Sequence, residues 1–506
     1  MITSPRRLVS LQRLGRALCT ALAATFATVG AVQAQDDAPW TSPHPLKLSG
    51  ARALAMVAAA DRDLPYVPGE VLVRFKPGMT RTAQQRALRA VRSQPQVDDL
   101  RWIHDIAVLR DTREADATVL AAQLREQPEV LSAEPNLLHR LQATPNDPSF
   151  AERQWNLTAL DMPRAWDINP GAASNVTVAV LDTGMNTRNV TYQFRSWNGT
   201  AVGPVNVPFA INPDLSAARV DDGADFVFWD GPVLDFDGHG THVTGTVGQE
   251  TNNETALAGM AYRATIMPLK VCIGFWEVQF ILSAGGYSGF APADAGGCPD
   301  DATIEAVYYA ADHGAKVLNL SLGGTAPSQA LKEALIYAVE KGAFISIAAG
   351  NEFEDGNPVS YPAADAATID GAMSVGAVGR ELTHASYSNT GTWVEIAAPG
   401  GDIAVDAAEG AIWQVGLSPT DAQPHQTTGP RFDRYFMVGL DGTSMAAPHV
   451  AGLGALLYSQ GVTKPAAIEA LIKKTAKDQG EDGVDDEYGA GLIQPRAALF
   501  GLGVAK

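Results

Sequence analysis

The pattern of hydrophobic positions changes near residue 156. Downstream of this point, short apolar runs lack the polar alternation of a half-exposed strand; they cover 176–181, 316–322, 343–349, 373–378 and 394–398. Such runs are typical of strands that are buried on both faces of a parallel sheet. Helical periodicity over 302–311 and 328–340 lies between several of them. The pattern predicts an α/β fold with a mostly parallel sheet and helices on both faces.

A smaller unit precedes this region, at residues 69–140. Its pattern predicts strands over 70–75, 100–110 and 130–134, with helices over 82–92 and 118–126 between them. This order predicts a small α+β domain. The proline-punctuated stretch 35–68 is expected to be a linker, and the larger domain is expected to span 145–506.

The first 34 residues have the pattern of a cleavable export signal. Four arginines precede an apolar stretch over 17–32, which ends in Val32-Gln33-Ala34. This arrangement predicts a secretory signal peptide and therefore an extracellular protein, with the periplasm as the alternative. No later segment has eighteen consecutive apolar residues, so we expect no membrane anchor after the signal is removed.

Charge and cysteine content sharpen this picture. The net charge of −19 is unevenly spread: +4 for 1–34, zero for 35–140 and −23 for 141–506. The acidic charge of residues 141–506 argues against a nucleic-acid partner and favours bound cations.

Outside the signal only two cysteines remain, Cys272 and Cys298, which form an even pair in an oxidising setting. Either they form a disulfide, which would contribute roughly 3 to 4 kcal/mol, or they are two unpaired thiols.

Four polar side chains occupy places where an α/β sheet binds its ligands. Asp182 and Asn351 each follow a predicted strand, while His239 and Ser444 each open a helix of small residues. Acyl transfer needs these four groups: a hydroxyl, an imidazole that takes its proton, a carboxylate that orients the imidazole, and donors for the oxyanion. The alternative roles are structural, with Ser444 capping a helix and Asn351 capping a turn.

The motifs around these residues resemble the subtilisin family of serine proteases, the subtilases. They are DTG at Asp182, HGTHVTG at His239, AAGN at Asn351 and GTSMAAPHVAG at Ser444, and the resemblance spans 155–498. It implies a three-layer subtilisin-like fold and a serine endopeptidase that uses no organic cofactor. Asp182 would orient His239, the general base and then acid, and Ser444 would be the nucleophile. The Asn351 side chain and the Ser444 backbone N–H would form the oxyanion hole.

The resemblance also implies a substrate cleft. Residues expected to pair with the substrate backbone or to wall its specificity pocket are Ser321, Leu322, Gly323, Gly324, Ala348, Ala349 and Ser360. Two insertions depart from the family pattern, one over 189–211 and one after Val271 that contains Phe275, Trp276, Phe280 and Tyr287. These aromatic residues either form a wall over the cleft or pack on the protein surface.

A calcium site and a propeptide complete the expectations. By the same resemblance Asp147, Asp214 and Asn253 would contribute to a structural calcium site, although such residues also form turns. The module at 69–140 resembles the family's ferredoxin-like inhibitory propeptide, which would occupy the cleft until it is cleaved between Pro135 and Asp147. An unrelated small binding domain is the alternative.

Two rival functions are weaker. A lipase or esterase would have a second glycine after its serine, where this chain has Gly442-Thr-Ser-Met-Ala446, and a different order of the three residues. A non-catalytic binding protein would not need all four chemical groups. The sequence therefore predicts a secreted serine endopeptidase that acts on protein or peptide substrates and is made as a self-processing precursor, with its own propeptide as an intramolecular inhibitor.

Overall fold

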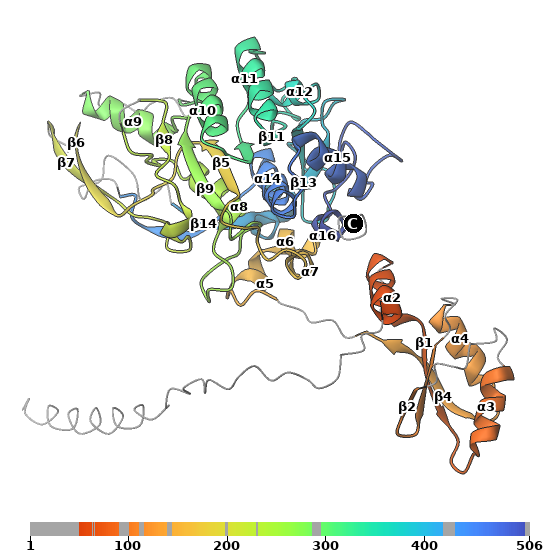
Figure 1. Ribbon diagram of the computed structural model, residues 1–506. Coiled ribbons are helices and arrows are strands. Elements are labelled where there is room, and N and C mark those ends of the chain that lie inside the picture. Colours follow the sequence, from red (N-terminus) through yellow and green to blue (C-terminus); the bar gives the residue numbers. More distant parts are fainter. Residues whose placement is uncertain are drawn as a thin grey trace, which may run out of the picture. The chain divides into compact units, whose positions relative to one another are not determined.

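The computed structural model describes residues 50–62, 64, 66–90, 101–110, 116–138, 144–197, 201–228, 231–285, 295–417 and 431–500. The chain divides into two compact units, one up to His139 and one from Arg140 (Figure 1). The expected signal peptide at 1–34 lies outside the described residues.

The first unit is an antiparallel sheet with helices. Its elements are α2 (Gly50–Asp61), β1 (Tyr66–Phe75), α3 (Arg81–Ala90), β2 (Arg101–Ile103), β3 (Ile106–Arg110), α4 (Ala117–Arg125) and β4 (Val130–Leu137). The strand order β2-β3-β1-β4 with α3 and α4 in the crossovers is the ferredoxin-like arrangement. Alternate residues of β1, such as Val71 and Val73, are fully buried in its core.

Two features of this unit differ from the sequence-based expectation. The stretch expected as a linker, 35–68, contains helix α2 and the start of β1. The single strand expected over 100–110 is a hairpin, because His104 has φ +54° and forms a turn with Asp105 between β2 and β3. A polar pair of this kind is compatible with a two-residue hairpin turn.

The second unit is built on a parallel sheet. Within the described residues the strand order is β13-β12-β11-β10-β5-β9-β8, and each neighbouring pair is parallel. These strands are β5 (Thr177–Asp182), β8 (Ala224–Asp225), β9 (Thr265–Lys270), β10 (Val317–Leu320), β11 (Phe344–Ala348), β12 (Ala372–Val378) and β13 (Ile396–Pro399). Five match predicted runs. Strands β9 and β8 were not predicted from the sequence, because Pro268 interrupts the apolar run of β9 and β8 has only two residues.

Helices cover both faces of this sheet. Successive side chains of β5 point to opposite faces, so Val178 and Val180 pack with α8 (His239–Gly248) and α14 (Thr443–Ser459). Ala179 and Leu181 pack with α10 (Asp300–Asp312) and α11 (Gln329–Glu340) on the other face (Figure 1). The three-layer α/β fold expected from the sequence is confirmed.

Shorter elements complete this unit. Its remaining helices are α5 (Phe150–Arg153), α6 (Trp155–Ala159), α7 (Met162–Trp166), η2 (Ala217–Arg219), α9 (Phe275–Ala284), α12 (Ala363–Ala366), α13 (Ile403–Asp406), η3 (Ala407–Gly410), α15 (Pro465–Thr475) and α16 (Pro495–Phe500). Two antiparallel hairpins flank the sheet: β6 (Val190–Trp197) with β7 (Val202–Phe209), and β14 (Ile412–Leu417) with β15 (Tyr435–Leu440). The first hairpin is the insertion seen at 189–211.

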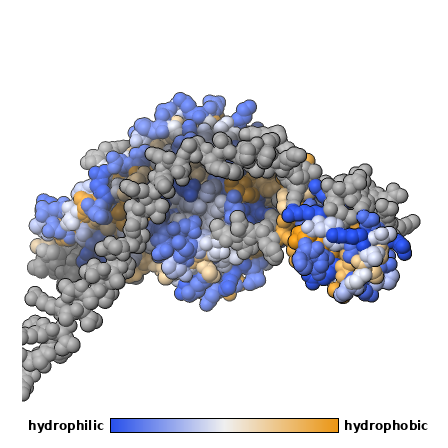
Figure 2. Space-filling model, turned by 60° about the horizontal axis from the view of Figure 1, so that its bottom comes forward, coloured by the Kyte–Doolittle hydropathy of each residue, from blue (hydrophilic) through white to orange (hydrophobic). Residues whose placement is uncertain are grey.

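The surface in Figure 2 is largely hydrophilic, with hydrophobic residues gathered in smaller patches. Among the described residues, no helix combines the length and the apolar character that a membrane span requires.

Candidate active site

Asp182 and His239 are brought together by the end of β5 and the start of α8. His239 Nδ1 lies 2.7 Å from Asp182 Oδ1, and the Thr183 backbone N–H donates to the same oxygen at 2.7 Å. Asp182 is 1 % exposed, so the carboxylate interacts with little screening by water. An Nδ1–H that donates to the carboxylate leaves Nε2 as the free acceptor of the ring.

Glycine makes this close approach possible. A Cβ on Gly240 would lie 2.4 Å from Gly184 O and 3.1 Å from Asp182 Oδ1. Any larger residue at this position would therefore push the start of α8 away from the end of β5. The need for close contact between α8 and β5 thus explains why a residue as small as Gly240 follows His239.

Asp235 organises the loop before His239. Its Oδ1 accepts from the Asp237 and Gly238 backbone N–H groups at 2.9 and 2.8 Å, and its Oδ2 accepts from the Thr241 N–H at 3.0 Å. The side chain is fully buried. The sequence motifs alone assign Asp235 no role. The available signal was an aspartate a few residues before a helix start, where its carboxylate can accept from several backbone N–H groups.

The electrostatics of this loop favour a charged imidazole. Burial alone lowers the pKa of His239, but the carboxylates of Asp182, Asp237 and Asp235 outweigh it and raise the pKa to about 9. Burial and the nearby Asp235 in turn raise the pKa of Asp237. His239 is therefore a stronger base than an isolated histidine.

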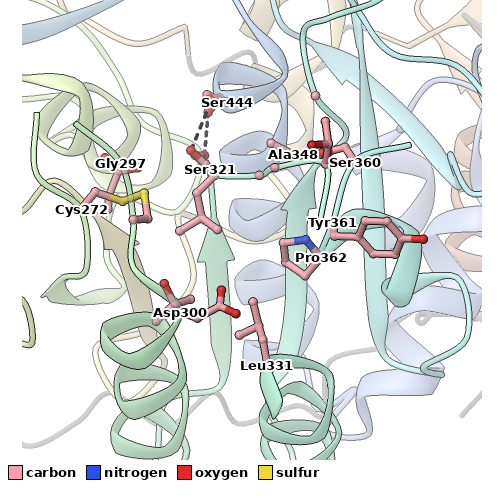
Figure 3. Close-up of a pocket in the computed structure, with 18 of the residues that line it drawn as sticks. Cys272, Gly297, Asp300, Ser321, Leu331, Ala348, Ser360, Tyr361, Pro362 and Ser444 are labelled. Carbon is pink, nitrogen blue, oxygen red and sulfur yellow. Dashed lines mark hydrogen bonds between the residues drawn. A yellow bond between two sulfur atoms is a disulfide. The ribbon is translucent and has the colours of Figure 1, made fainter. Parts of the chain in front are cut away.

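Ser444 is the second residue of α14 and is held by Ser321. The Ser444 carbonyl accepts a hydrogen bond from Ser321 Oγ at 2.8 Å, and Ser444 Oγ donates to the Ser321 carbonyl at 3.3 Å (Figure 3). The first bond substitutes for one that the helix lacks, because Pro448, four residues on, has no N–H. Pro448 lies inside α14, and Ser321 satisfies the carbonyl that it leaves free.

Asn351 has a fixed amide orientation. Its Oδ1 accepts from both the backbone N–H and the hydroxyl of Thr443, each at 2.8 Å. The amide carbonyl is thereby committed to Thr443, so the Nδ2 group is the end available for another acceptor. Gly442 lies beside it with φ +146°, a conformation that L residues rarely adopt.

A cleft of about 730 Å³ connects these side chains. Its lining includes Asp182, His239, Asn351, Ser444, Ser321, Leu322, Gly323, Gly324, Ala348 and Ser360. Figure 3 labels four of these residues, Ser321, Ala348, Ser360 and Ser444. Ala349 does not line the cleft: this residue is fully buried and its N–H donates to Val375 O. The expectation that Ala349 walls the cleft is wrong, because the side chain points into the sheet's core at the end of β11.

Two chain edges border the cleft. On one side Gly324 pairs with Tyr361, while the backbone of Leu322 and Gly323 makes no hydrogen bond within the described part of the chain. On the other side Cys272 and Cys298 form a disulfide, and Ile273 pairs with Gly297 through two bonds of 2.9 Å. Only the Leu322–Gly323 edge therefore offers unpaired backbone beside the cleft, because Ile273 and Gly297 use their backbone groups on each other.

The two insertions pack on each other. The ring of Phe280 in α9 lies 5.0 Å from that of Phe194 in β6, and Phe280 is 5 % exposed. Of the two alternatives, packing therefore holds for Phe280. Tyr287 lies outside the described residues, and so does the side chain of Trp276.

The expected calcium ligands lie close to one another. Asn253 donates through Nδ2 to Asp214 Oδ1 at 2.7 Å, and the Asn252 N–H donates to Asp147 Oδ2 at 2.9 Å. Burial raises the pKa of both Asp147 and Asp214, and the Asp147 charge raises that of Asp214 further. Neither carboxylate has a basic partner within the described ranges. Two buried carboxylates without a cation fit a hard cation such as calcium.

The other histidines of the motifs are structural. His242 is fully buried, and its Nε2 donates to Ile412 O and Val438 O at 3.0 and 3.2 Å. His449 binds Met445 O at 2.8 Å and Asn156 Nδ2 at 2.7 Å. Burial lowers the pKa of each to about 4, so both are neutral at neutral pH.

The fold and the cleft are those of an α/β serine hydrolase. Residues 173–491 match the subtilase family, and residues 53–136 match the fervidolysin N-terminal prodomain. The chain belongs to the subtilase family and is a subtilisin-like serine protease with an N-terminal prodomain.

Similar proteins agree with this assignment. The chain is 33 % identical to a thermophilic serine proteinase of Bacillus sp. (strain AK1), covering 84 % of this chain and 86 % of the relative. It is 34 % identical to thermitase of Thermoactinomyces vulgaris, covering 66 % and 91 %. A solved structure of a protease from Pseudoalteromonas arctica superposes with a TM-score of 0.52 at 28 % identity, covering 71 % of this chain and 99 % of the other.

Proposed function

We propose that this subtilase is a secreted endopeptidase in which Asp182, His239 and Ser444 form the catalytic triad. The observation that carries the proposal is the 2.7 Å bond between His239 and Asp182 in the same cleft as Ser444. With Nδ1 committed to Asp182, His239 Nε2 takes the Ser444 hydroxyl proton as Oγ attacks the peptide carbonyl. In the structure, Ser444 Oγ donates to the Ser321 carbonyl instead. The Ser444 side chain would therefore rotate toward His239 when substrate is bound.

The remaining steps are release of the amine and hydrolysis of the acyl-enzyme. His239 returns the proton to the leaving amine, and the acyl group stays on Ser444 Oγ until water, deprotonated by His239, releases the acid. Asn351 Nδ2 and the Ser444 backbone N–H donate to the oxyanion. The orientation of the Asn351 amide by Thr443 supports this role, because a preorganised donor pays no reorganisation cost in the transition state.

The substrate is a polypeptide in extended conformation. The free backbone of Leu322 and Gly323 supports pairing of the substrate as an added strand, and Gly297 lines the facing side of the cleft. Ala348 and Ser360 line the pocket for one substrate side chain. The small lining residues leave room for a large apolar group.

The prodomain is proposed to inhibit the enzyme until it is cut off. Its match to a known prodomain family and its separate compact fold support this, and we place the cleavage between Pro135 and Asp147, where the first unit ends. Export is supported by the signal-like residues 1–34. The net charge of −19 argues against nucleic acid as a partner.

Calcium is proposed as a structural cofactor. Asp147, Asp214 and Asn253 would hold it, supported by the two buried carboxylates that have no basic partner in the described ranges. Asn253 would offer its amide oxygen to the ion. The ion would neutralise the carboxylates and fasten the loop around Asn253 to the segment at Asp147.

The decisive experiment compares the full precursor with its Ser444→Ala variant by intact mass over time. We expect the native chain to lose its first 135 to 147 residues and then to digest casein, while the variant stays whole. A native chain that is trimmed by added protease yet neither digests casein nor reacts with a serine-directed sulfonyl fluoride would contradict the proposal. Identical self-trimming of both chains would contradict Ser444 as the nucleophile.

A further inference from the structure

A second cavity, of about 430 Å³, lies between the two insertions. It is bordered by β6, by α9 and by the segment 231–236, and it shares no lining residue with the active-site cleft. Most of its walls are apolar or aromatic: Tyr192, Phe194, Phe228, Leu234, Phe236 and Phe280. The volume falls within the range of about 300–1,000 Å³ that is typical of small-molecule sites.

One buried polar group lines this apolar cavity. Glu277 is 3 % exposed, and its Oε2 accepts from Lys270 Nζ at 2.7 Å. Its Oε1 has no hydrogen-bond partner within the part of the chain that the structure describes. Since Oε1 is not sealed off from the cavity, it can accept a hydrogen bond from a group that is bound there.

The charges around Glu277 are balanced and are compatible with a neutral donor. Lys270 already neutralises the carboxylate and also donates to Thr183 O and Cys272 O, at 2.7 and 3.1 Å. The exposed Arg195 adds a second positive charge to the lining, and Asp225 Oδ1 is occupied by the N–H groups of Val227 and Phe228. With Lys270 paired to Glu277 and Arg195 opposite Asp225, the positive and negative charges around the cavity balance, so a neutral occupant suits it.

We propose that this cavity binds a neutral aromatic group that carries one hydrogen-bond donor, as a phenol or an indole does. The ring packs against Phe194, Phe236 and Phe280, which already contact one another at centroid distances of 5.0 to 6.0 Å. The donor bonds to Glu277 Oε1. The same chemistry is available as a tyrosine or tryptophan side chain of a polypeptide and as a free small molecule.

The cavity is linked to the Asp182–His239 pair by two short paths. Glu277 binds Lys270, which donates to the carbonyl of Thr183, the residue after Asp182. Phe236 lines the cavity while its neighbour Asp237 lines the active-site cleft. An occupant therefore contacts residues that position the proposed general base.

The test uses the full-length Ser444→Ala chain and two probes of nearly the same shape, indole and indene, of which only indole has an N–H donor. Calorimetric titration should show one site that binds indole about tenfold more tightly than indene. Ala284→Phe, which fills the cavity from the end of α9, should abolish indole binding. Ala467→Phe on the exposed face of α15 is the matched control and should change nothing.

Equal affinities for indole and indene, or unchanged indole binding in a folded Ala284→Phe protein, would overturn the proposal. If Ala284→Phe does not fold, Phe228→Ala removes part of the wall at a residue that is 41 % exposed, and indole should then bind several-fold more weakly. Unchanged binding in that variant also overturns the proposal. N-acetyltryptophanamide distinguishes the sources: binding like indole indicates a side chain of a polypeptide, and exclusion indicates a free small molecule.

Discussion

Ser321 and Ser444 bind each other in both directions. Ser321 Oγ donates to the Ser444 carbonyl at 2.8 Å, and Ser444 Oγ donates to the Ser321 carbonyl at 3.3 Å. Because Ser321 follows β10 and Ser444 lies in the first turn of α14, the pair fastens the proposed nucleophile to the C-terminal end of a central strand (Figure 3).

This relationship predicts a specific stability effect. Ser321→Ala should lower the free energy of unfolding by about 1–2 kcal/mol, because the Ser444 carbonyl loses its donor and Pro448 cannot replace it. In a Pro448→Ala background, where residue 448 has an N–H, the same change should cost less. Calorimetric melting in the Ser444→Ala background, which prevents autolysis, measures both. Equal losses with and without Pro448 would show that the carbonyl is not the cause.

Asn351 should affect turnover more than binding. Asn351→Ala should reduce kcat by roughly 10²–10³ with a much smaller change in KM, since the donor acts on charge that develops in the transition state. Asn351→Asp retains the oxygen that accepts from Thr443 but removes the Nδ2 donor. It should lose at least as much activity while melting near the native temperature. Native-like turnover by Asn351→Asp would exclude Asn351 from the oxyanion hole.

Peptidase turnover should be highest at alkaline pH. Burial lowers the pKa of His239, but Asp182, Asp237 and Asp235 raise it to about 9, and only the neutral ring can accept a proton. Turnover should therefore rise with pH until about 9 and fall as acid protonates His239. Asp237→Asn removes one carboxylate and should move this limb down by roughly 1 unit. Asp167→Asn, at an exposed site, is the control; an unmoved limb in Asp237→Asn would refute the assignment.

Calcium removal should destabilise the mature protein. At a calcium concentration of about 100 Kd, binding adds roughly 2.7 kcal/mol to the free energy of unfolding, which a chelator removes. Asp214→Asn should abolish most of this calcium-dependent increase in melting temperature, whereas Asp222→Asn at an exposed position should retain it. The same response to calcium in the Asp214→Asn and native proteins would rule out this site.

Much of the architecture could be read from local patterns. The runs that became β5, β10, β11, β12 and β13 were apolar throughout, because a strand that is buried on both faces has no solvent side to mark with polar residues. The strand that contains Pro268 was missed because its pairing with β5 joins residues distant in the chain. The turn at His104 was missed because it depends on one positive φ angle.

The sequence by itself determined the chemical groups and their order: Asp182, His239, Asn351 and Ser444, each at a strand end or a helix start. Local steric rules and side-chain chemistry are enough for that. The tertiary structure alone decided that the Asn351 amide oxygen accepts from Thr443, that Ala349 faces the core, and that Glu277 from an insertion neutralises Lys270. These contacts join residues on different elements, whose distances and burial are set only when the layers pack.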